Sequence, residues 1–300
     1  MEVRPKKSLG QHFLTDQSIA RAIVDSLSPA PRVLEVGPGM GVLTQYLLTR
    51  IAAPSRLGAP EVTTTPSCLE VPAGGTKRGK SSALPEPSRR SGPILKVVEI
   101  DSESVVYLRE HYPALGPGLL EADFLKLPLD KIFAEPFSVI GNFPYNISSQ
   151  IFFHILDYRD LVPEVVCMIQ KEVAERLAAG PGSKVYGILS VLLQMWYDIE
   201  YRFTVGEGAF VPPPKVKSAV IRLTRNARTD AGCDEALLRR IVKATFNQRR
   251  KTIRNGLRSI GITASPSGPE IPFLDARPEQ LSVEDFITLT RAVTEARREG

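Results

Sequence analysis

Cysteine is scarce in this sequence: three residues occur among 300, far apart and in no C-x-x-C pair. A disulfide-dense mini-domain is therefore excluded, and no cysteine zinc site is indicated. Histidine is equally rare, and we interpret His111 and His154 as structural or surface residues. This composition is typical of a reduced, cytoplasmic protein, and we expect no metal.

Long apolar segments are also lacking. The longest nearly unbroken one, around residues 188–193, is too short to cross a bilayer. The N-terminal residues, with Lys6 and Lys7, run directly into polar sequence and not into the apolar stretch of a secretory leader. We therefore expect neither a membrane span nor a secretory signal. With 43% hydrophobic residues, the chain can build a core for one large domain or two smaller ones.

Positive charge is concentrated in one part of the chain. The net charge is +5, yet residues 215–258 alone contain 13 basic and 3 acidic side chains. Such a block is typical of a surface that binds a polyanion, and a solvated helix face is the ordinary alternative. Arg249, Arg250 and Lys251 form its densest cluster, with few acids nearby in the sequence to pair with them. Charge alone leaves both interpretations open.

The pattern of apolar residues predicts strands that alternate with helices. Short strands are expected at residues 32–36, 95–101, 119–124, 137–142, 165–169 and 218–223. Such alternation implies a parallel, helix-covered sheet. Beyond residue 225 the pattern becomes helical, over residues 235–246, 251–260 and 283–297. We therefore expect an α/β domain over residues 1–225 and a small all-helical domain over residues 226–300.

Residues 52–93 fit neither domain. These 42 residues include 7 Pro, 5 Gly, 6 Ser and 4 Thr but no aromatic residue, which is the composition of a flexible loop. Glu99 follows Gly37 by 62 residues, and without the 42 residues of this segment the distance along the chain is 20. That is the usual spacing between a glycine loop and a ribose-binding acid. We interpret the segment as a flexible insertion into an otherwise ordinary unit.

A glycine-rich turn, GPGMG, begins at Gly37 between a predicted strand and a helical segment at residues 42–49. Glycine permits a tight turn and a close approach of the backbone to a ligand, so Gly37 and Gly39 are candidate cofactor contacts. A dinucleotide fingerprint would need glycine where Val42 stands. The sequence therefore argues against a nicotinamide oxidoreductase.

Two acids stand at the ends of the next two predicted strands. Glu99 has no obvious partner nearby in the sequence and is a candidate ligand for ribose hydroxyls. Asp123 can accept a hydrogen bond from an adenine amino group, or it can simply cap the helix that follows. Because parallel strands end at one edge of the sheet, these groups predict an adenosine-type pocket there.

The segment GNFPYN, residues 141–146, is the most specific signal in the sequence. The exocyclic amine of a nucleobase is a poor nucleophile, because its lone pair is delocalised into the ring. The Asn142 side-chain oxygen and a backbone carbonyl next to or at Pro144 can accept its hydrogens and favour a pyramidal nitrogen. Tyr145 can stack on the base. Catalysis would then rest on positioning and local electrostatics, without a strong general base.

Taken together, these segments resemble the ribosomal small-subunit adenine dimethyltransferases (the KsgA family). The similarity covers nearly the whole chain apart from residues 52–93. It is carried by the segments LGQHFL, LEVGPG, VEID, DF, GNFPYNIS and PPPKVKSAV, which begin at residues 9, 34, 98, 123, 141 and 212.

The resemblance implies a Rossmann-like methyltransferase fold with a mostly parallel seven-stranded sheet, helices on both faces, and a small C-terminal helical domain. It implies that S-adenosylmethionine is the cofactor, held by His12, Leu14, Gly37, Gly39, Glu99, Asp123 and Asn142. The resemblance also implies that the catalytic residues are Asn142, Pro144 and Tyr145. Phe210 is implied as a second stacking platform, and Arg249, Arg250 and Lys251, together with Lys6 and Lys7, as contacts to the RNA backbone.

The implied reaction is transfer of methyl groups to N6 of two adjacent adenines in a hairpin loop near the 3′ end of small-subunit (16S) ribosomal RNA. The partner would be a pre-30S particle, and we expect a monomer. Two alternatives stay open: a large-subunit adenine methyltransferase of the macrolide-resistance type, and a ribosome-assembly factor that acts mainly by binding. Two departures from the family pattern are His12 for a frequent Asn, and Phe143 for a common Leu whose side chain we expect to pack inward.

Overall fold

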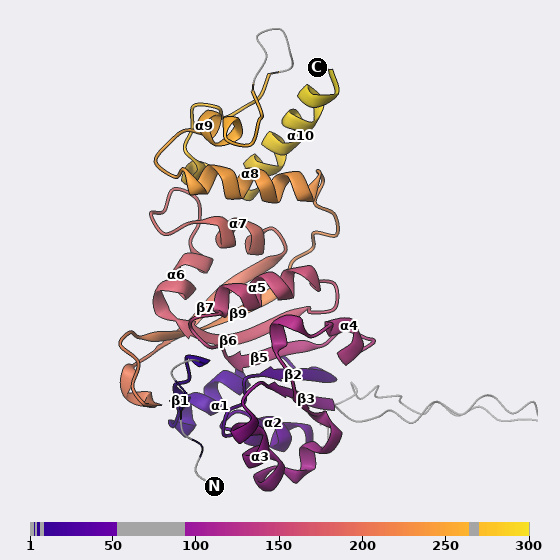
Figure 1. Ribbon diagram of the computed structural model, residues 1–300, viewed down its shortest axis with the longest axis vertical. Coiled ribbons are helices and arrows are strands. Elements are labelled where there is room, and N and C mark those ends of the chain that lie inside the picture. The colour runs from indigo at the N-terminus through magenta and orange to yellow at the C-terminus, as the bar shows by residue number, and fades with distance from the viewer. Residues whose placement is uncertain (1–2, 4, 7–8, 53–93, 264–269, 300) are drawn as a thin grey trace, which may run out of the picture.

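A seven-stranded sheet, in the order β4-β3-β2-β5-β6-β9-β7, is the centre of the computed structural model (Figure 1). Residues 3, 5–6, 9–52, 94–263 and 270–299 are described. The strands are β2 (Arg32–Val36), β3 (Ile94–Glu99), β4 (Leu119–Glu121), β5 (Ser138–Asn142), β6 (Glu164–Gln170), β7 (Tyr197–Val205) and β9 (Ser218–Arg225). Strands β2 to β6 pair with one another in parallel. Strand β9 pairs antiparallel with both β6 and β7. The expected mostly parallel sheet is therefore confirmed.

The predicted insertion interrupts the crossover from β2 to β3. Strand β3 pairs with β2 in parallel from its first residue, with Ile94 opposite Arg32. The pairing on which the spacing argument depended is thus present, with Glu99 as the last residue of β3. The insertion itself, apart from its first residue, lies outside the described residues.

Helices cover both faces of the sheet because the strand side chains alternate between two apolar cores. On β6, Val165, Cys167 and Ile169 belong to the core that includes α5, whereas Val166 and Met168 belong to the core that includes α1 and α2. The helices are α1 (Gln17–Asp25), α2 (Thr44–Ala52), α3 (Ser102–His111), α4 (Leu129–Ile132), α5 (Ser148–Asp157), α6 (Lys171–Ala178), α7 (Ile188–Gln194), α8 (Glu235–Asn247), α9 (Ile253–Arg258) and α10 (Val283–Glu299).

The structure contains strand β7 and a small second sheet that the apolar pattern of the sequence does not predict. Strand β7 is an edge strand that pairs only with β9, and its side chains are largely exposed, so it lacks a continuous apolar run. The second sheet joins β1 (Phe13–Leu14) to β8 (Phe210–Val211), which are too short to give any periodic signal.

The C-terminal helices α8, α9 and α10 lie at the opposite end of the molecule from α2 and α3 (Figure 1). The last residue of β9, Arg225, coincides with the predicted end of the α/β domain. One apolar core nevertheless runs from the sheet through Leu193 of α7 to Leu238 of α8 and Phe286 of α10. The division into two domains stays a prediction, since the buried core is continuous across it.

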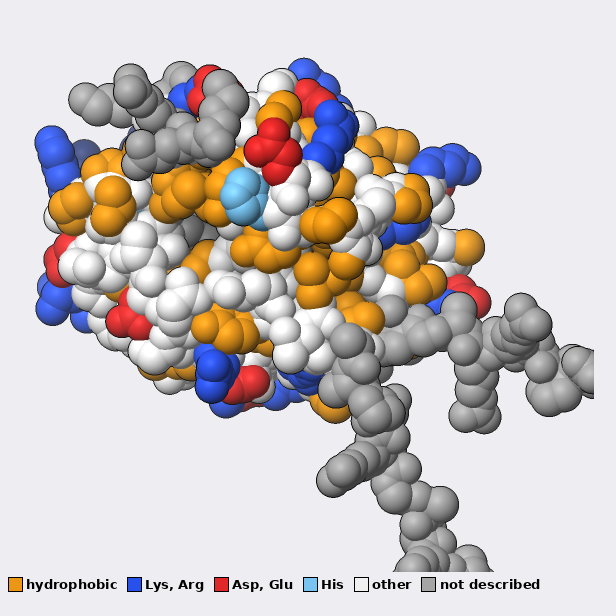
Figure 2. All heavy atoms as spheres, turned by 90° about the horizontal axis from the view of Figure 1, so that it is seen from below, with side chains coloured by type: hydrophobic (Ala, Val, Ile, Leu, Met, Phe, Trp, Pro, Cys, Tyr) orange, Lys and Arg blue, Asp and Glu red, His pale blue; other side chains and the backbone are white. Residues whose placement is uncertain are grey.

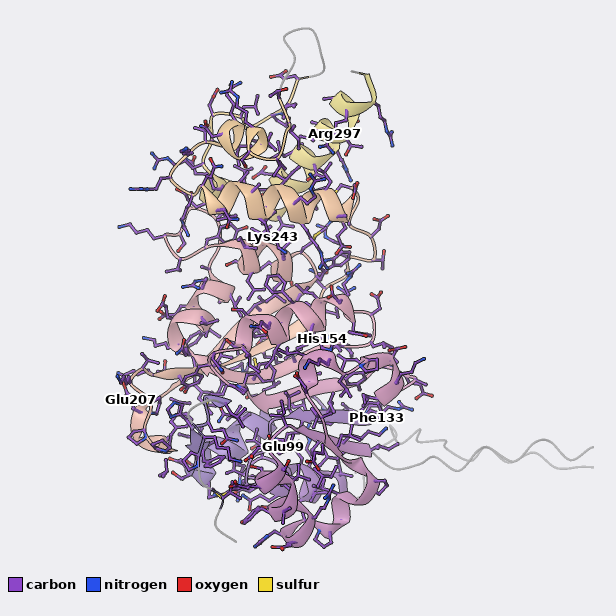
Figure 3. The ribbon with its side chains drawn as sticks, viewed as in Figure 1. Glu99, Phe133, His154, Glu207, Lys243 and Arg297 are labelled. Carbon is purple, nitrogen blue, oxygen red and sulfur yellow. The ribbon has the colours of Figure 1, made fainter. Side chains whose placement is uncertain are left out.

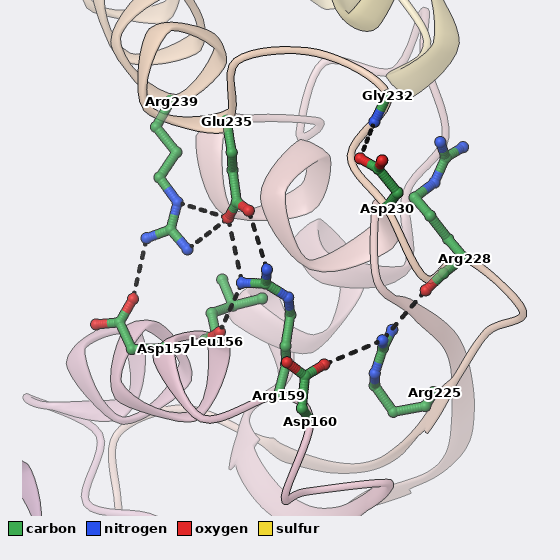
Figure 4. Close-up of polar contacts among 10 residues, drawn as sticks. All are labelled: Leu156, Asp157, Arg159, Asp160, Arg225, Arg228, Asp230, Gly232, Glu235 and Arg239. Carbon is green, nitrogen blue, oxygen red and sulfur yellow. Dashed lines mark hydrogen bonds and ion pairs between the residues drawn. The ribbon is translucent and has the colours of Figure 1, made fainter.

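A polar network also ties α8 to the end of α5 (Figure 4). The Arg159 guanidinium donates to both carboxylate oxygens of Glu235, at 3.2 and 3.0 Å, and lies 4.0 Å from the centre of the Trp196 ring. Arg239 completes the network by pairing with Glu235 and with Asp157. The contacts of Glu235 are partly buried, so they fix α8 on the sheet domain more firmly than exposed ion pairs such as that of Asp157 would.

Candidate active site

A cavity of about 600 Å³ opens at the carboxyl ends of the central strands. The chain leaves β2 toward β3 on one side, and β5 lies on the other, so this edge is a topological switch point where ligands commonly bind. Figure 3 labels Glu99 in this part of the molecule. The structure gathers nine predicted site residues around the cavity: His12, Leu14, Gly37, Gly39, Glu99, Asp123, Asn142, Pro144 and Tyr145.

The glycine loop approaches the cavity with backbone angles that favour glycine. Gly37 and Gly39 have φ values of +67° and +56°, in the left-handed region. A Cβ atom on Gly39 would also come within 3.0 Å of the Phe13 ring. The loop therefore presents backbone to the cavity, as the sequence predicts for a ligand-binding turn.

Glu99 is buried and is held in place by three backbone N–H groups. Gly39 N donates to Oε2 at 3.1 Å, while Ile100 N and Asp101 N each donate to Oε1 at 2.9 Å. Burial raises the pKa of Glu99, and these three hydrogen bonds oppose the shift. A carboxylate offers about four acceptor positions, so the group still has capacity for a hydroxyl donor in the cavity.

Asp123 fills the capping role of the two that the sequence leaves open, and contact with an adenine stays a prediction. Its Oδ1 accepts from Leu125 N at 3.0 Å and so caps the 3₁₀ helix Phe124–Lys126. The same residue lines the cavity. Capping fixes the carboxyl group at the rim and does not exclude contact with a ligand.

Glu35 is a site residue that the sequence reasoning missed. It lies on β2, is 1% exposed, and lines the cavity. Its Oε2 accepts from the Thr44 hydroxyl at 2.7 Å, while Oε1 has no hydrogen-bond partner among the described residues. Burial raises its pKa to about 8. The available signal was an acid inside a buried strand directly before the glycine loop.

Ile100 is a second cavity residue that the sequence did not predict. It is 51% exposed although it is large and apolar, and it lines the cavity next to Glu99. Together with Phe124 and Leu125, it gives this side of the cavity an apolar surface suited to a flat ring.

Asn142 and Tyr145 are oriented by specific contacts. Asn142 Nδ2 donates to the backbone carbonyl of His12 at 3.1 Å. The Tyr145 hydroxyl lies 2.5 Å from the Ser218 Oγ, and Ser218 is fully buried. The carbonyl of Pro144 accepts a turn hydrogen bond from Ile147 N at 3.2 Å, which leaves it a second lone pair.

The side chain of His12 has its own contacts. Its ring stacks on Tyr145 with centroids 5.5 Å apart and an angle of 25° between the planes. Its Nδ1 lies 2.9 Å from the Pro212 carbonyl, which can only accept, so Nδ1 carries the proton. The contact to Asn142 uses the His12 backbone carbonyl, so the ring and the backbone of this residue have separate partners.

The N-terminal segment that carries His12 is anchored beside the cavity. Lys6 Nζ lies 2.5 Å from Asp101 and 3.0 Å from Glu103, and Gln11 accepts from the Lys6 backbone at 2.8 Å. Lys6 is thus paired within the protein, and its predicted contact with RNA stays a prediction. Lys7 lies outside the described residues.

Phe210, the predicted second stacking platform, does not line the cavity. It pairs with Leu14 across the small sheet, and its ring is 2% exposed in the same apolar core. In this arrangement it supports the wall that Leu14 contributes. Stacking of Phe210 on a base stays a prediction and requires β8 to shift.

The basic cluster lies away from the cavity, at the end of α8. Arg249 donates to the Ser183 carbonyl at 3.1 Å and lies 6.0 Å from the Phe246 ring centre, whereas Arg250 and Lys251 are exposed. Figure 3 labels Lys243 on the same helix. At the end formed by α2 and α3, by contrast, basic, acidic and apolar side chains are intermixed (Figure 2).

Much of the basic block is neutralised by acids from elsewhere in the sequence or from its own helix. The free charge of the block is therefore lower than its own 13 basic and 3 acidic side chains indicate. Five of its arginines form ion pairs: Arg222 with Glu164, Arg225 with Asp160, Arg228 with Glu284, Arg239 with Asp157 and Glu235, and Arg254 with Asp275.

Within the part of the chain that the structure describes, no helix combines the length and apolar character needed to span a membrane. Among the same residues, no group of three or more His, Cys, Asp or Glu side chains is arranged to hold a metal ion.

The sheet order is that of the Rossmann-like methyltransferase fold, which similar solved structures share. A dimethyladenosine transferase from Plasmodium falciparum has a TM-score of 0.66 at 21% identity, covering 93% of this chain and 96% of its own. The 23S rRNA methyltransferase ErmE has a TM-score of 0.57 at 22% identity, covering 93% of this chain and 99% of its own.

The model of the family described as ribosomal RNA adenine dimethylase matches residues 3–56 and 94–292. The chain belongs to this family, which confirms the resemblance drawn from its motifs. It is 52% identical to ribosomal RNA small subunit methyltransferase A of Phocaeicola vulgatus, over 98% of this chain and 91% of that one. The corresponding Bacteroides thetaiotaomicron protein is 50% identical, over 98% and 96%. The gap in the family match falls within the predicted insertion.

Proposed function

We propose that this protein transfers methyl groups from S-adenosylmethionine to N6 of two adjacent adenines in a hairpin loop near the 3′ end of small-subunit ribosomal RNA, and takes part in small-subunit biogenesis. Support comes from membership of the adenine dimethylase family and from relatives near 50% identity named as small-subunit methyltransferases. The large-subunit alternative is less well supported, since the similar ErmE structure is only 22% identical.

The observation that carries the proposal is the orientation of Asn142 at the end of β5. One of its two N–H groups donates to the His12 carbonyl, and Oδ1 is the acceptor that the amide can offer to a target amine. The second lone pair of the Pro144 carbonyl can accept the other hydrogen. Both interactions favour a pyramidal nitrogen, with its lone pair free to form the new N–C bond. Tyr145 supplies the stacking face for the base.

The residues around the cavity fit S-adenosylmethionine, which supplies an electrophilic methyl group when bound. The unpaired Oε1 of buried Glu35 suits a cationic ammonium group, and the glycine loop presents backbone beside it. Glu99 would hold the ribose hydroxyls, and Asp123 the adenine amino group, against the apolar side formed by Ile100. His12, Leu14, Gly37 and Gly39 would complete the cofactor site.

RNA would be held at a second surface, on the C-terminal helices. Arg250 and Lys251 are exposed there, and Arg249 adds charge although it also contacts Ser183. Phosphate contacts distant from the reacting base position a nucleic acid without reading its sequence. The particle recognised would be a small-subunit precursor, and the protein would act as a monomer in the cytoplasm.

The test is to incubate the protein with methyl-labelled S-adenosylmethionine and with unmethylated small or large ribosomal subunits in parallel. We expect label in small-subunit RNA alone. Label in large-subunit RNA would favour the macrolide-resistance type of activity. Tight binding to small subunits without any label would favour an assembly factor that acts by binding.

A further inference from the structure

The segment from Val211 to Ser218 carries an unusual group of exposed side chains. Val211, at 58%, is the most exposed large hydrophobic residue in the described part of the chain, and Val216 is 45% exposed. Lys215 and Lys217 are exposed on either side of Val216. No ion pair involves either lysine among the described residues. Single exposed valines are common on protein surfaces, but two with interleaved lysines call for a partner.

The segment is firmly anchored, and two of its three anchors, Phe13 and His12, line the active-site cavity. Val211 pairs with Phe13, whose neighbours line the cavity. The Pro212 carbonyl contacts His12 Nδ1 at 2.9 Å, and the Lys217 carbonyl accepts from Lys171 N at 2.9 Å. Three successive prolines restrict the backbone between these anchors. The exposed side chains therefore project from a rigid support.

The segment also lies next to the residue proposed to stack on the target base. Ser218 holds the Tyr145 hydroxyl, and Val216 stands two residues before it, which limits their Cα separation to about 7 Å. An apolar side chain at this place can enter a gap between bases, while a lysine beside it neutralises the adjoining phosphate.

We propose that residues 211–217 form a wedge that enters the RNA hairpin loop beside the target adenine. Val211 and Val216 contact the bases that unstack, and Lys215 and Lys217 contact their phosphates. The wedge holds the loop open while the adenine lies against Tyr145. This proposal rests on the proposed function, and it adds the residues that open the substrate.

The test compares Val211→Ser/Val216→Ser with Val106→Ser, a matched control on α3 whose side chain is 40% exposed. Each protein is bound to a hairpin RNA that carries 2-aminopurine at the target adenine, and to a linear RNA of the same sequence. The 2-aminopurine fluorescence should rise when the wild type binds the hairpin. We expect the double variant to lose most of this rise and to bind the linear RNA normally. Its methylation of small subunits should fall about tenfold or more, the order set by base stacking and unstacking energies. The control should match the wild type.

Equal fluorescence and equal methylation for the double variant and the wild type would overturn the wedge. An equal loss of affinity for the hairpin and the linear RNA would also overturn it, because the valines would then contribute to RNA binding in general and not to opening of the loop. Both valines are exposed, so the unfolding midpoint should stay unchanged. If the wild type methylates no subunit, the proposed function fails, and that result is visible without any variant.

Lys215→Ala/Lys217→Ala should lower the salt slope of hairpin binding by about 1.5, and an unchanged slope contradicts the phosphate contacts.

Discussion

Asn142 donates its side-chain N–H to the backbone carbonyl of His12, 3.1 Å away. A carbonyl can only accept, so this contact fixes the amide with its nitrogen toward residue 12. The oxygen is the end left for the target amine. The contact uses the backbone of residue 12 and not the imidazole ring.

Removing this amide tests its role directly. Asn142→Ala should lower the rate of methyl transfer at saturating substrates at least ~100-fold, the order lost with one preorganised polar group. RNA affinity should change little, because the proposed phosphate contacts lie on other elements. Single-turnover kinetics and RNA binding, measured on the same preparation, separate the two effects. A variant with near-normal turnover contradicts the mechanism.

The hydrogen bond between Tyr145 and Ser218 should position the stacking ring. Tyr145→Phe and Ser218→Ala should each lower kcat/KM about fivefold, since one hydrogen bond contributes ~1 kcal/mol. The double variant should lose no more than either single one, because both remove the same contact. Tyr201→Phe is a matched control: its hydroxyl bonds Thr204 at 2.7 Å on the edge strand β7, away from the cavity. Additive losses would show that the two residues act separately.

Glu35 predicts a pH dependence of stability. Burial raises its pKa from an ordinary 4.5 to about 8, so the folded state keeps the proton that the unfolded chain releases between these values. The folded protein therefore loses stability as pH rises from about 5 to 8, by roughly 3 kcal/mol from this group. Glu35→Gln should remove that loss.

The measurement is denaturant unfolding of both proteins, without cofactor, at pH 5 and pH 8. The stability advantage of Glu35→Gln should be small at pH 5 and large at pH 8. An advantage that is the same at both values contradicts a buried, protonated Glu35.

The exposed part of the basic cluster should govern the salt dependence of RNA binding. Arg250→Ala/Lys251→Ala should flatten the plot of log affinity against log salt by about 1.5 units, the value for two phosphate contacts. Arg254→Ala is the control, since Arg254 pairs with Asp275 at 2.9 Å. Arg249→Ala should also lower the unfolding midpoint, because Arg249 contacts Ser183. An unchanged slope for the double variant would identify the cluster as a solvated face.

The α/β fold and most of the site were predictable because their signals are local. Parallel central strands such as β6 are continuous apolar runs, and Gly37, Glu99 and Asn142 each follow or end such a run. Parallel pairing then brings their ends together, although Gly37 and Asn142 are 105 residues apart in the sequence.

What the sequence did not predict depends on partners that are distant in the chain. The burial of Phe210 results from a two-residue pairing with β1, which leaves no periodic pattern. The ion pairs of the basic block use acids that lie up to 82 residues away, as for Arg239 and Asp157. The open acceptor on Glu35 follows from tertiary burial alone.

The most direct test of the central proposal is the identity and position of the product. Small-subunit RNA from the methylation reaction should be digested and mapped by mass spectrometry, for the wild type and for Asn142→Ala. We predict N6,N6-dimethyladenosine at two adjacent positions in one hairpin loop near the 3′ end, formed by the wild type and nearly absent with the variant. Methyl groups on another base or another atom, or equal product from both proteins, would contradict the account.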